Sequence, residues 1–301
     1  MHPQVKKLLE IPKIEQKSLE WYKTRWNMLS ASDFLQCLGR GKFGTAREII
    51  QKKVEPFVEH GPTTNPFFIH GIKFEQVASD IYAKMHNVKL YEFGIIQHPK
   101  YDWAGCSPDG IREDGIMLEI KAPLKRRIKP GDPVPEQYFY QVQGQLDVCG
   151  LTQCDYFECE FVECKTVSQW EFSIQTKGVF ITNPDGTYEY GPLILEDQYN
   201  QKDKKILGEY IHKNKSRAIT YWCLNTYNLV RVEHDPVFME KTIEQLREVW
   251  NKILFYRENH DAYITEVVQA ISIETEKYNK TVFIEEKETT ETKFSGYAFL
   301  D

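Results

Sequence analysis

The sequence lacks an apolar run long enough to span a membrane, and its N-terminus lacks the pattern of a signal peptide. Its seven cysteines form no C-x-x-C pair, so the tight spacings that hold an iron–sulfur cluster on four cysteines are missing. A net positive charge is missing too, because the formal net charge is −6. These absences predict an intracellular protein with reduced, mostly buried thiols and no membrane partner. They exclude a generally basic nucleic-acid binder, but not a local basic patch.

The composition is that of an ordinary globular protein, with 41% hydrophobic and 27% charged residues in 301. Helical patterns precede a strand group at 88–121, and a helix over 136–149 separates this group from further strands at 154–190. An amphipathic helix over 236–257 follows, while 218–232 mixes helix and strand signals. This order predicts an α/β domain with a central mixed sheet flanked by helices, in which 136–149 is the crossover. A stretch rich in Glu, Lys and Thr at about 280–296 predicts a flexible tail.

One stretch combines acids and an amine in a pattern typical of metal-assisted hydrolysis. Asp109 lies in a Pro-Asp-Gly turn, and Glu119 and Lys121 lie two residues apart, on one face of a predicted strand. If the turn folds back as a hairpin, Asp109 lies beside Glu119, and two carboxylates that close repel each other unless a cation joins them. Oxygen ligands of this kind suit Mg²⁺ or Mn²⁺, and a neighbouring lysine can orient or deprotonate a water. A surface hairpin with an exposed Glu/Lys pair is the alternative.

Basic and hydroxyl side chains near this stretch are candidates for phosphate binding. Ser30 is a candidate N-cap of a short helix, with Asp33 three residues later as in a capping box. A helix start with free N–H groups, hydroxyls and the nearby Arg25 is also an anion site. A basic run follows the motif, and it consists of Lys121, Lys125, Arg126, Arg127 and Lys129.

Two helices supply further polar candidates. Glu75 adjoins the apolar stripe of a helix predicted over 71–86, near its start, where a surface glutamate that favours the helix N-terminus is the alternative. Tyr138, Gln141 and Gln145 share one face of the helix over 136–149, where a solvated glutamine pair is the alternative.

Five motifs occur in a characteristic order: Leu-Ser-Ala-Ser-Asp at 29–33, Gly71-x-x-Phe74-Glu75, Ser-Pro-Asp-Gly at 107–110, Glu-Ile-Lys-Ala-Pro at 119–123, and Tyr-Gln-Val-Gln-Gly-Gln at 140–145. In this order they resemble the YqaJ-type viral recombinase and lambda exonuclease family, within the PD-(D/E)xK nuclease superfamily. The resemblance covers about residues 20–260. It implies a restriction-endonuclease-like core in a nuclease domain over 1–260, with a partly flexible C-terminal extension over 261–301.

The resemblance also implies an activity. It is that of a Mg²⁺-dependent 5′→3′ exonuclease, with Mn²⁺ as a substitute, which releases mononucleotides from linear duplex DNA and leaves 3′ single-stranded tails for recombination or repair. By motif position, Asp109, Glu119 and the Ile120 carbonyl would bind metal. Glu75 would bind the metal or its water, Lys121 would activate or hold the water, and Gln141 would orient the site.

A pocket for the 5′-phosphate belongs to the same resemblance. The matching residues are Arg25, Ser32, Ser107 and Arg127, where Lys125 and Arg126 compete with Arg127, and Ser30, Tyr138 and Gln145 join this DNA-binding set. Double-stranded DNA ends are the implied partner. A single-strand annealing protein and a homotrimer stay open, as does a location in the cytoplasm or nucleus of a host cell if the source is viral. The alternatives are an endonuclease or structure-specific nuclease of the superfamily, and an inactive DNA-end-binding protein.

Overall fold

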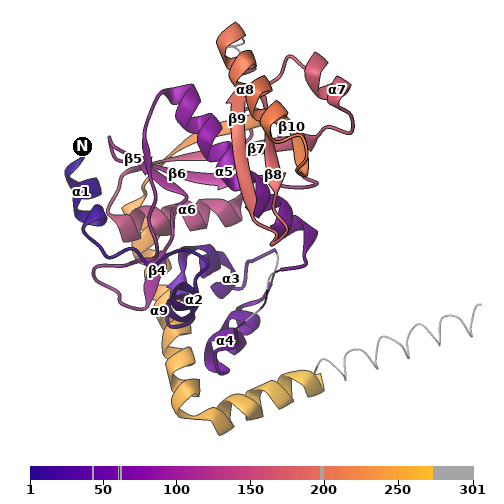
Figure 1. The fold of residues 1–301 in the computed structure, drawn as a ribbon. Coiled ribbons are helices and arrows are strands. Elements are labelled where there is room, and N and C mark those ends of the chain that lie inside the picture. The colour runs from indigo at the N-terminus through magenta and orange to yellow at the C-terminus, as the bar shows by residue number, and fades with distance from the viewer. Residues whose placement is uncertain (43, 60, 62, 197–199, 274–301) are drawn as a thin grey trace, which may run out of the picture. The chain divides into compact units, whose positions relative to one another are not determined.

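The computed structural model describes residues 1–42, 44–59, 61, 63–196 and 200–273. By its contacts the chain divides into two compact units, Met1–Arg247 and Glu248–Asp301. The helices drawn in Figure 1 are α1 Pro3–Leu9, α2 Leu19–Trp26, the 3₁₀ helix η1 Ala31–Asp33, α3 Phe34–Cys37, α4 Ala46–Val54, α5 Pro66–His86, α6 Glu136–Cys149, α7 Val167–Phe172, α8 Gln201–Lys213 and α9 Pro236–Glu258. The strands are β1 Leu29–Ser30, β2 Leu90–Tyr91, β3 Ile96–Gln97, β4 Ala104–Cys106, β5 Gly110–Arg112, β6 Ile116–Lys121, β7 Gln153–Glu163, β8 Lys177–Thr182, β9 Tyr188–Ile194 and β10 Ile219–Glu233.

A seven-stranded sheet is the centre of the first unit, with the strand order β2-β5-β6-β7-β10-β8-β9. Only β6 and β7 are parallel among its paired described strands, and α6 is the crossover between them. A separate three-stranded sheet has the order β1-β4-β3. The predicted α/β class, with a central mixed sheet flanked by helices and a crossover over 136–149, is confirmed.

The two faces of β6 meet different helices. Leu118 and Ile120 join a buried cluster with the apolar residues of α5. Glu119 points to the other face, where α6 presents Gln141 and Gln145 to it. The alternation predicted for 116–121 is therefore real, but both faces are buried, which places a carboxylate in the interior.

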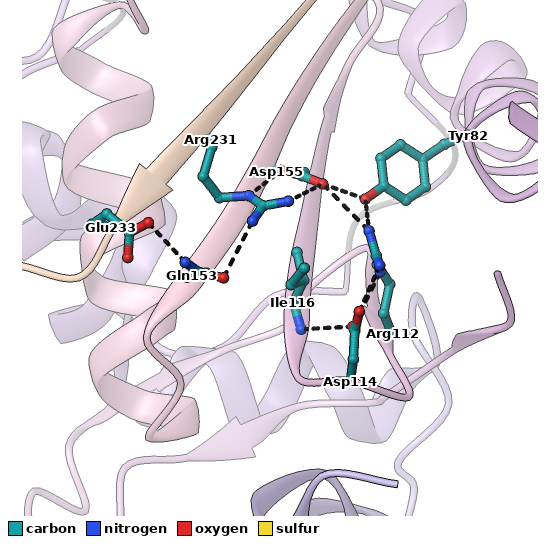
Figure 2. A network of polar contacts seen from close by, with 8 residues as sticks. All are labelled: Tyr82, Arg112, Asp114, Ile116, Gln153, Asp155, Arg231 and Glu233. Carbon is teal, nitrogen blue, oxygen red and sulfur yellow. Dashed lines mark hydrogen bonds and ion pairs between the residues drawn. The ribbon is translucent and has the colours of Figure 1, made fainter. Parts of the chain in front are cut away.

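A buried polar network fixes the hairpin of β5 and β6 on the α5 face of the sheet (Figure 2). Asp155 of β7 is 3% exposed and accepts hydrogen bonds from the Tyr82 hydroxyl of α5 and from the guanidinium of Arg231 on β10. Arg112, at the end of β5, lies 3.9 Å from the same carboxylate and donates to Tyr82 at 3.3 Å. A buried charge needs such partners, and here they join a helix and three strands.

The far end of α6 is held by a carboxylate between two imidazoles. Oxygens of Asp147 lie 3.1 Å from Nε2 of His98, which follows β3, and 3.3 Å from Nε2 of His234, which follows β10. Burial alone would raise the pKa of Asp147, but the imidazoles of His234 and His98 lower it well below its usual range. These contacts fix the end of α6 against the sheet, and they thereby help to position Gln141 and Gln145 of the same helix.

Replacing Asp147 by asparagine is expected to lower the free energy of unfolding by about 2 kcal/mol at pH 7. The folded-state pKa is depressed, so the carboxylate's contribution is fully present above the unfolded value near 3.8 and is lost as the pH falls further. Urea unfolding at pH 7 and at pH 3 would measure this, with the exposed Asp102→Asn as the control. A D147N variant that loses as much stability on acidification as the wild type would contradict the assignment.

Two expectations about secondary structure need correction, and a third question that the sequence left open is decided. The helix predicted over 71–86 begins at Pro66, because Asn65 caps it through the Phe67 N–H. The strands predicted over 154–190 are interrupted by α7, which is capped by Thr166 and anchored by Trp170 on the Gly178 carbonyl. The segment with mixed signals at 218–232 falls almost entirely in the single strand β10, and pairing with β7 and β8 explains why the strand forms.

The cysteines are mostly core residues, and the described helices do not meet the requirements of a membrane span. Six of the seven thiols are buried and Cys164 is partly exposed, in line with the predicted buried thiols. None of the helices in the described part of the chain is long and apolar enough to cross a membrane.

The second unit contains the end of α9 and helical residues over 260–273. Lys252 and Glu266 form an ion pair at 2.8 Å, and the rings of Tyr256 and Tyr263 lie 5.7 Å apart. The tail predicted at 280–296 lies outside the described residues, and the predicted domain boundary at 260 stays a prediction.

Candidate active site

The hairpin of β5 and β6 brings the two acids of the motif together. Its register pairs Gly110 with Leu118, so the next step places Asp109 opposite Glu119. Oδ2 of Asp109 accepts a hydrogen bond from the Ile120 N–H at 2.6 Å. We expected the Pro-Asp-Gly segment to form the hairpin turn. The turn instead lies at Gly115, whose φ of +93° suits glycine. The preceding strand β4 belongs to the other sheet, and Asp109 lies directly before β5 rather than in a turn that ends a strand.

Glu119 is held on both oxygens although it is only 1% exposed. Gln141 and Gln145, one helical turn apart on α6, donate from their Nε2 atoms to Oε1 and Oε2 at 2.6 and 2.7 Å. Lys121 donates to Oε1 at 2.5 Å. The glutamines are thus not solvated surface residues, and their amides fix the rotamer of a buried carboxylate.

Lys121 lies among the same residues. Its Nζ is 3.2 Å from Oε1 of Gln141 and 4.7 Å from the centre of the Tyr138 ring. Burial would lower the pKa of Lys121, but the charges of Glu119 and Asp109 raise it above its ordinary value. The ammonium is therefore charged at neutral pH, and Tyr138, Gln141 and Gln145 all face it or its partner Glu119.

The electrostatics of Asp109 favour a bound cation. Burial, followed by the charges of Glu119 and Glu75, raises the pKa of this carboxyl well above its usual range. A divalent cation between these oxygens would remove the repulsion. The carboxylates and the Ile120 carbonyl that would hold it are hard oxygen ligands, which fit Mg²⁺ or Mn²⁺. Within the described ranges, however, no three Asp, Glu, His or Cys side chains already lie close enough to form a metal cluster.

Glu75 opens onto a cavity of about 260 Å³ beside Asp109 and Ile120. It lies in the middle of α5, not near its start as predicted, so the N-terminal helix dipole does not explain its position. The cavity is lined by Lys13, Glu15, Gln16, Lys17, Glu75, Gln76, Ser79, Glu92, Phe93, Asp109 and Ile120. Glu119 is not among these residues, because its side chain is turned to α6.

Four of the predicted phosphate ligands lie in one chain of contacts. Arg25 donates to Oγ of Ser32 at 3.1 Å, and Ser30 and Ser32 share a hydroxyl contact of 3.1 Å. Ser107 accepts a hydrogen bond from the indole N–H of Trp21 at 3.0 Å, and the guanidinium of Arg25 lies 4.5 Å from the Trp21 ring centre. Trp21 therefore joins Ser107 to the arginine and orients both.

The basic run after β6 is divided by its contacts. Arg126 pairs with Glu158 and lies 3.4 Å from the Tyr156 hydroxyl. Lys125 lies 5.4 Å from the Phe67 ring centre. Arg127 is exposed, and among the described residues it forms no hydrogen bond or ion pair with Arg25, Ser32 or Ser107. The structure therefore does not bring Arg127 to the three residues with which it was predicted to form the 5′-phosphate pocket.

Two residues of the site were not predicted as site residues from the sequence. Trp21 precedes Arg25 by one helical turn, and that spacing could have indicated the stacking. Lys53 of α4 is 2% exposed and donates to the Arg25 carbonyl, with Asp33 3.9 Å away. Burial, partly opposed by Asp33, lowers the pKa of Lys53 to about 8. Nothing in the sequence pattern marks this lysine as buried.

Comparison with known proteins finds the same resemblance. Residues 20–154 match the YqaJ-like viral recombinase domain. The resemblance drawn from the five motifs is thereby confirmed. An uncharacterized protein of Acanthamoeba polyphaga mimivirus is 30% identical over 310 residues, a match that includes 84% of this chain. The chain spans 55% of that relative's length. Every predicted site residue, from Arg25 to Gln145, falls inside the YqaJ-like segment.

Solved structures resemble the fold. An alkaline exonuclease from Laribacter hongkongensis, LHK-Exo, superposes with a TM-score of 0.53 at 18% identity, over 83% of this chain and 100% of that one. A second structure of LHK-Exo, in complex with dAMP, gives the same values. At this identity the likeness establishes the fold, in which the YqaJ-like segment contributes α2 to β6 and the crossover α6.

Proposed function

We propose that this protein is a Mg²⁺-dependent 5′→3′ exonuclease that acts on linear double-stranded DNA. The observation that carries the proposal is the pairing of Asp109 with Glu119 across one hairpin, with Lys121 bonded to Glu119. The match to a recombinase domain and the likeness to an exonuclease fold support a nuclease.

The chain's own residues divide the work of the reaction. Asp109, Glu119, the Ile120 carbonyl and Glu75 would hold the cation, which when bound supplies an activated water and positive charge at the phosphodiester. Gln141 and Gln145 hold Glu119 in place. Lys121, as an ammonium, would donate a hydrogen bond to the attacking water or to a phosphate oxygen.

The pocket around Arg25 would select the 5′ end. A guanidinium can pair with two phosphate oxygens, and the Ser32 and Ser107 hydroxyls can donate to the others. Trp21 and Ser32 already orient the arginine, so little side-chain freedom would be lost on binding. A phosphate held there would place the next phosphodiester over the acids. Arg127, in the exposed loop, could join only after moving.

Release of mononucleotides from a linear 5′-phosphorylated duplex with Mg²⁺, compared with closed circular DNA and with chelator present, tests this function. We expect degradation of the linear duplex alone, from its 5′ ends, and none with chelator. Cutting of circles would favour an endonuclease. Binding of ends without cleavage would favour a DNA-end-binding protein.

Replacing Arg25 by alanine is expected to reduce the preference for phosphorylated over hydroxyl 5′ ends by about ten-fold or more, because a charge-assisted phosphate contact is lost. The ratio of initial rates on the two substrates measures it. Lys23→Ala, on the same helix, is the matched control. An unchanged ratio in R25A would remove this arginine from the pocket.

The 3′ tails left by this activity would be substrates for recombination, and a single-strand annealing protein would be the natural recipient. A viral relative supports action inside a host cell. A ring-shaped homotrimer around the duplex would explain processivity, and the molar mass in solution would test it.

A further inference from the structure

The chain between α1 and α2, residues 10–18, forms a segment that we call the N-terminal strap. Lys13 forms an ion pair with Glu92 at 3.1 Å. Gln16 donates from Nε2 to the carbonyl oxygen of Phe93 at 2.9 Å. These contacts dock the strap on the chain that precedes β3, along one wall of the cavity that contains Asp109.

The strap is also fixed by its backbone. A Cβ at Gly94 would overlap the carbonyl oxygen of Ile14, so glycine permits this close approach. At the other end, Ser18 caps α2 by accepting from the Trp21 N–H at 3.2 Å. Lys17 lies between these anchors with φ of +67°, a left-handed conformation that is unfavourable for a lysine. Such strain persists where the surroundings impose it, often at a functional site.

The position imposed on Lys17 brings its ammonium to a candidate metal ligand. Nζ of Lys17 lies 3.7 Å from Oε2 of Glu75, and both side chains line the cavity with Asp109 and Ile120. Lys17 lies outside the segment that matches the family model, so the family match does not account for it.

We propose that Lys17 is a positioning residue of this site: it holds the Glu75 carboxylate in the metal-free protein and competes with the divalent cation for it. The inference rests on the proposed function, because it takes Glu75 as a metal ligand. Metal binding would then replace the Lys17 ammonium by the cation as the counter-ion of Glu75. Because the strap is anchored at both ends, Lys17 would stay beside the cavity.

The affinity for Mn²⁺ in the absence of DNA tests the proposal, read from the free-ion electron paramagnetic resonance signal or by calorimetry. Lys17→Met is expected to bind Mn²⁺ about two- to five-fold more tightly than the wild type, the range for loss of an exposed ion pair. Lys17→Arg should retain the wild-type affinity. Lys13→Met is the matched control, since it removes a charge from the same strap and cavity wall but from a pair with Glu92.

A double-mutant cycle with Glu75→Gln separates a direct pair from a general charge effect. In the E75Q background, K17M should leave the Mn²⁺ affinity unchanged. An equal gain in both backgrounds, an equal gain in K13M, or no gain in K17M would overturn the role of Lys17. A wild-type protein that binds no Mn²⁺ would instead refute the metal-dependent function itself, and the inference with it.

Discussion

Replacing Asp109 by asparagine is expected to reduce DNA cleavage by about three orders of magnitude or more while DNA binding is retained. Burial, followed by the charges of Glu119 and Glu75, raises the pKa of this carboxyl. An amide at this position removes the negative charge that would attract the cation. Asparagine can still accept the hydrogen bond from the Ile120 N–H, so the hairpin should keep its register.

Three measurements separate loss of chemistry from loss of structure in this variant. Single-turnover cleavage should fall, Mn²⁺ binding should weaken strongly, and the affinity for a 5′-phosphorylated duplex should stay close to that of the wild type. Asp114→Asn is the matched control, because Asp114 is an exposed acid on the same hairpin that pairs with Arg112 and not with the residues of the site. Retained turnover in D109N would remove Asp109 from the catalytic set.

Replacing Lys121 by methionine is expected to reduce the cleavage rate by about 10²- to 10⁴-fold, the usual contribution of a positioned proton donor or acceptor. Glu119 would keep its bonds from Gln141 and Gln145, so the acids should stay in place. Because a positive charge beside Glu119 is lost, Mn²⁺ affinity should stay the same or rise. This direction is opposite to that expected for D109N.

The contrast between the two variants is the informative result. Lys125→Met, in the exposed loop after β6, controls for general loss of positive charge near the DNA. If K121M loses metal binding together with cleavage, the lysine supports the acids rather than the reaction. If K121M cleaves at the wild-type rate, the amine has no part in the chemistry.

Local patterns were enough to predict much of this site. Alternation in β6 placed Glu119 and Lys121 on one face, and helical spacing placed Gln141 and Gln145 on a shared face of α6. The order of the motifs predicted the family resemblance, and the order of helical and strand patterns predicted the α/β core. These features depend on residues close together in sequence, for which periodicity is informative.

The features that the sequence did not predict depend on contacts between residues far apart along the chain. The Pro-Asp-Gly segment has the composition of a hairpin turn. However, the strand before it, β4, belongs to the three-stranded sheet, and the hairpin turn lies at Gly115. The contacts of Lys17 with Glu75 and of Lys53 with Arg25 join residues far apart along the chain. Both lysines look like ordinary surface charges until the fold is known.

Ile120 contributes to the site through its backbone and not through its side chain. The peptide N–H of Ile120 binds Asp109, while the Ile120 side chain packs into the apolar cluster below α5. An alanine scan would therefore report a packing defect at this position and miss its polar contribution. An ester in place of the amide removes this N–H and keeps the side chain, so it would reveal the polar contribution.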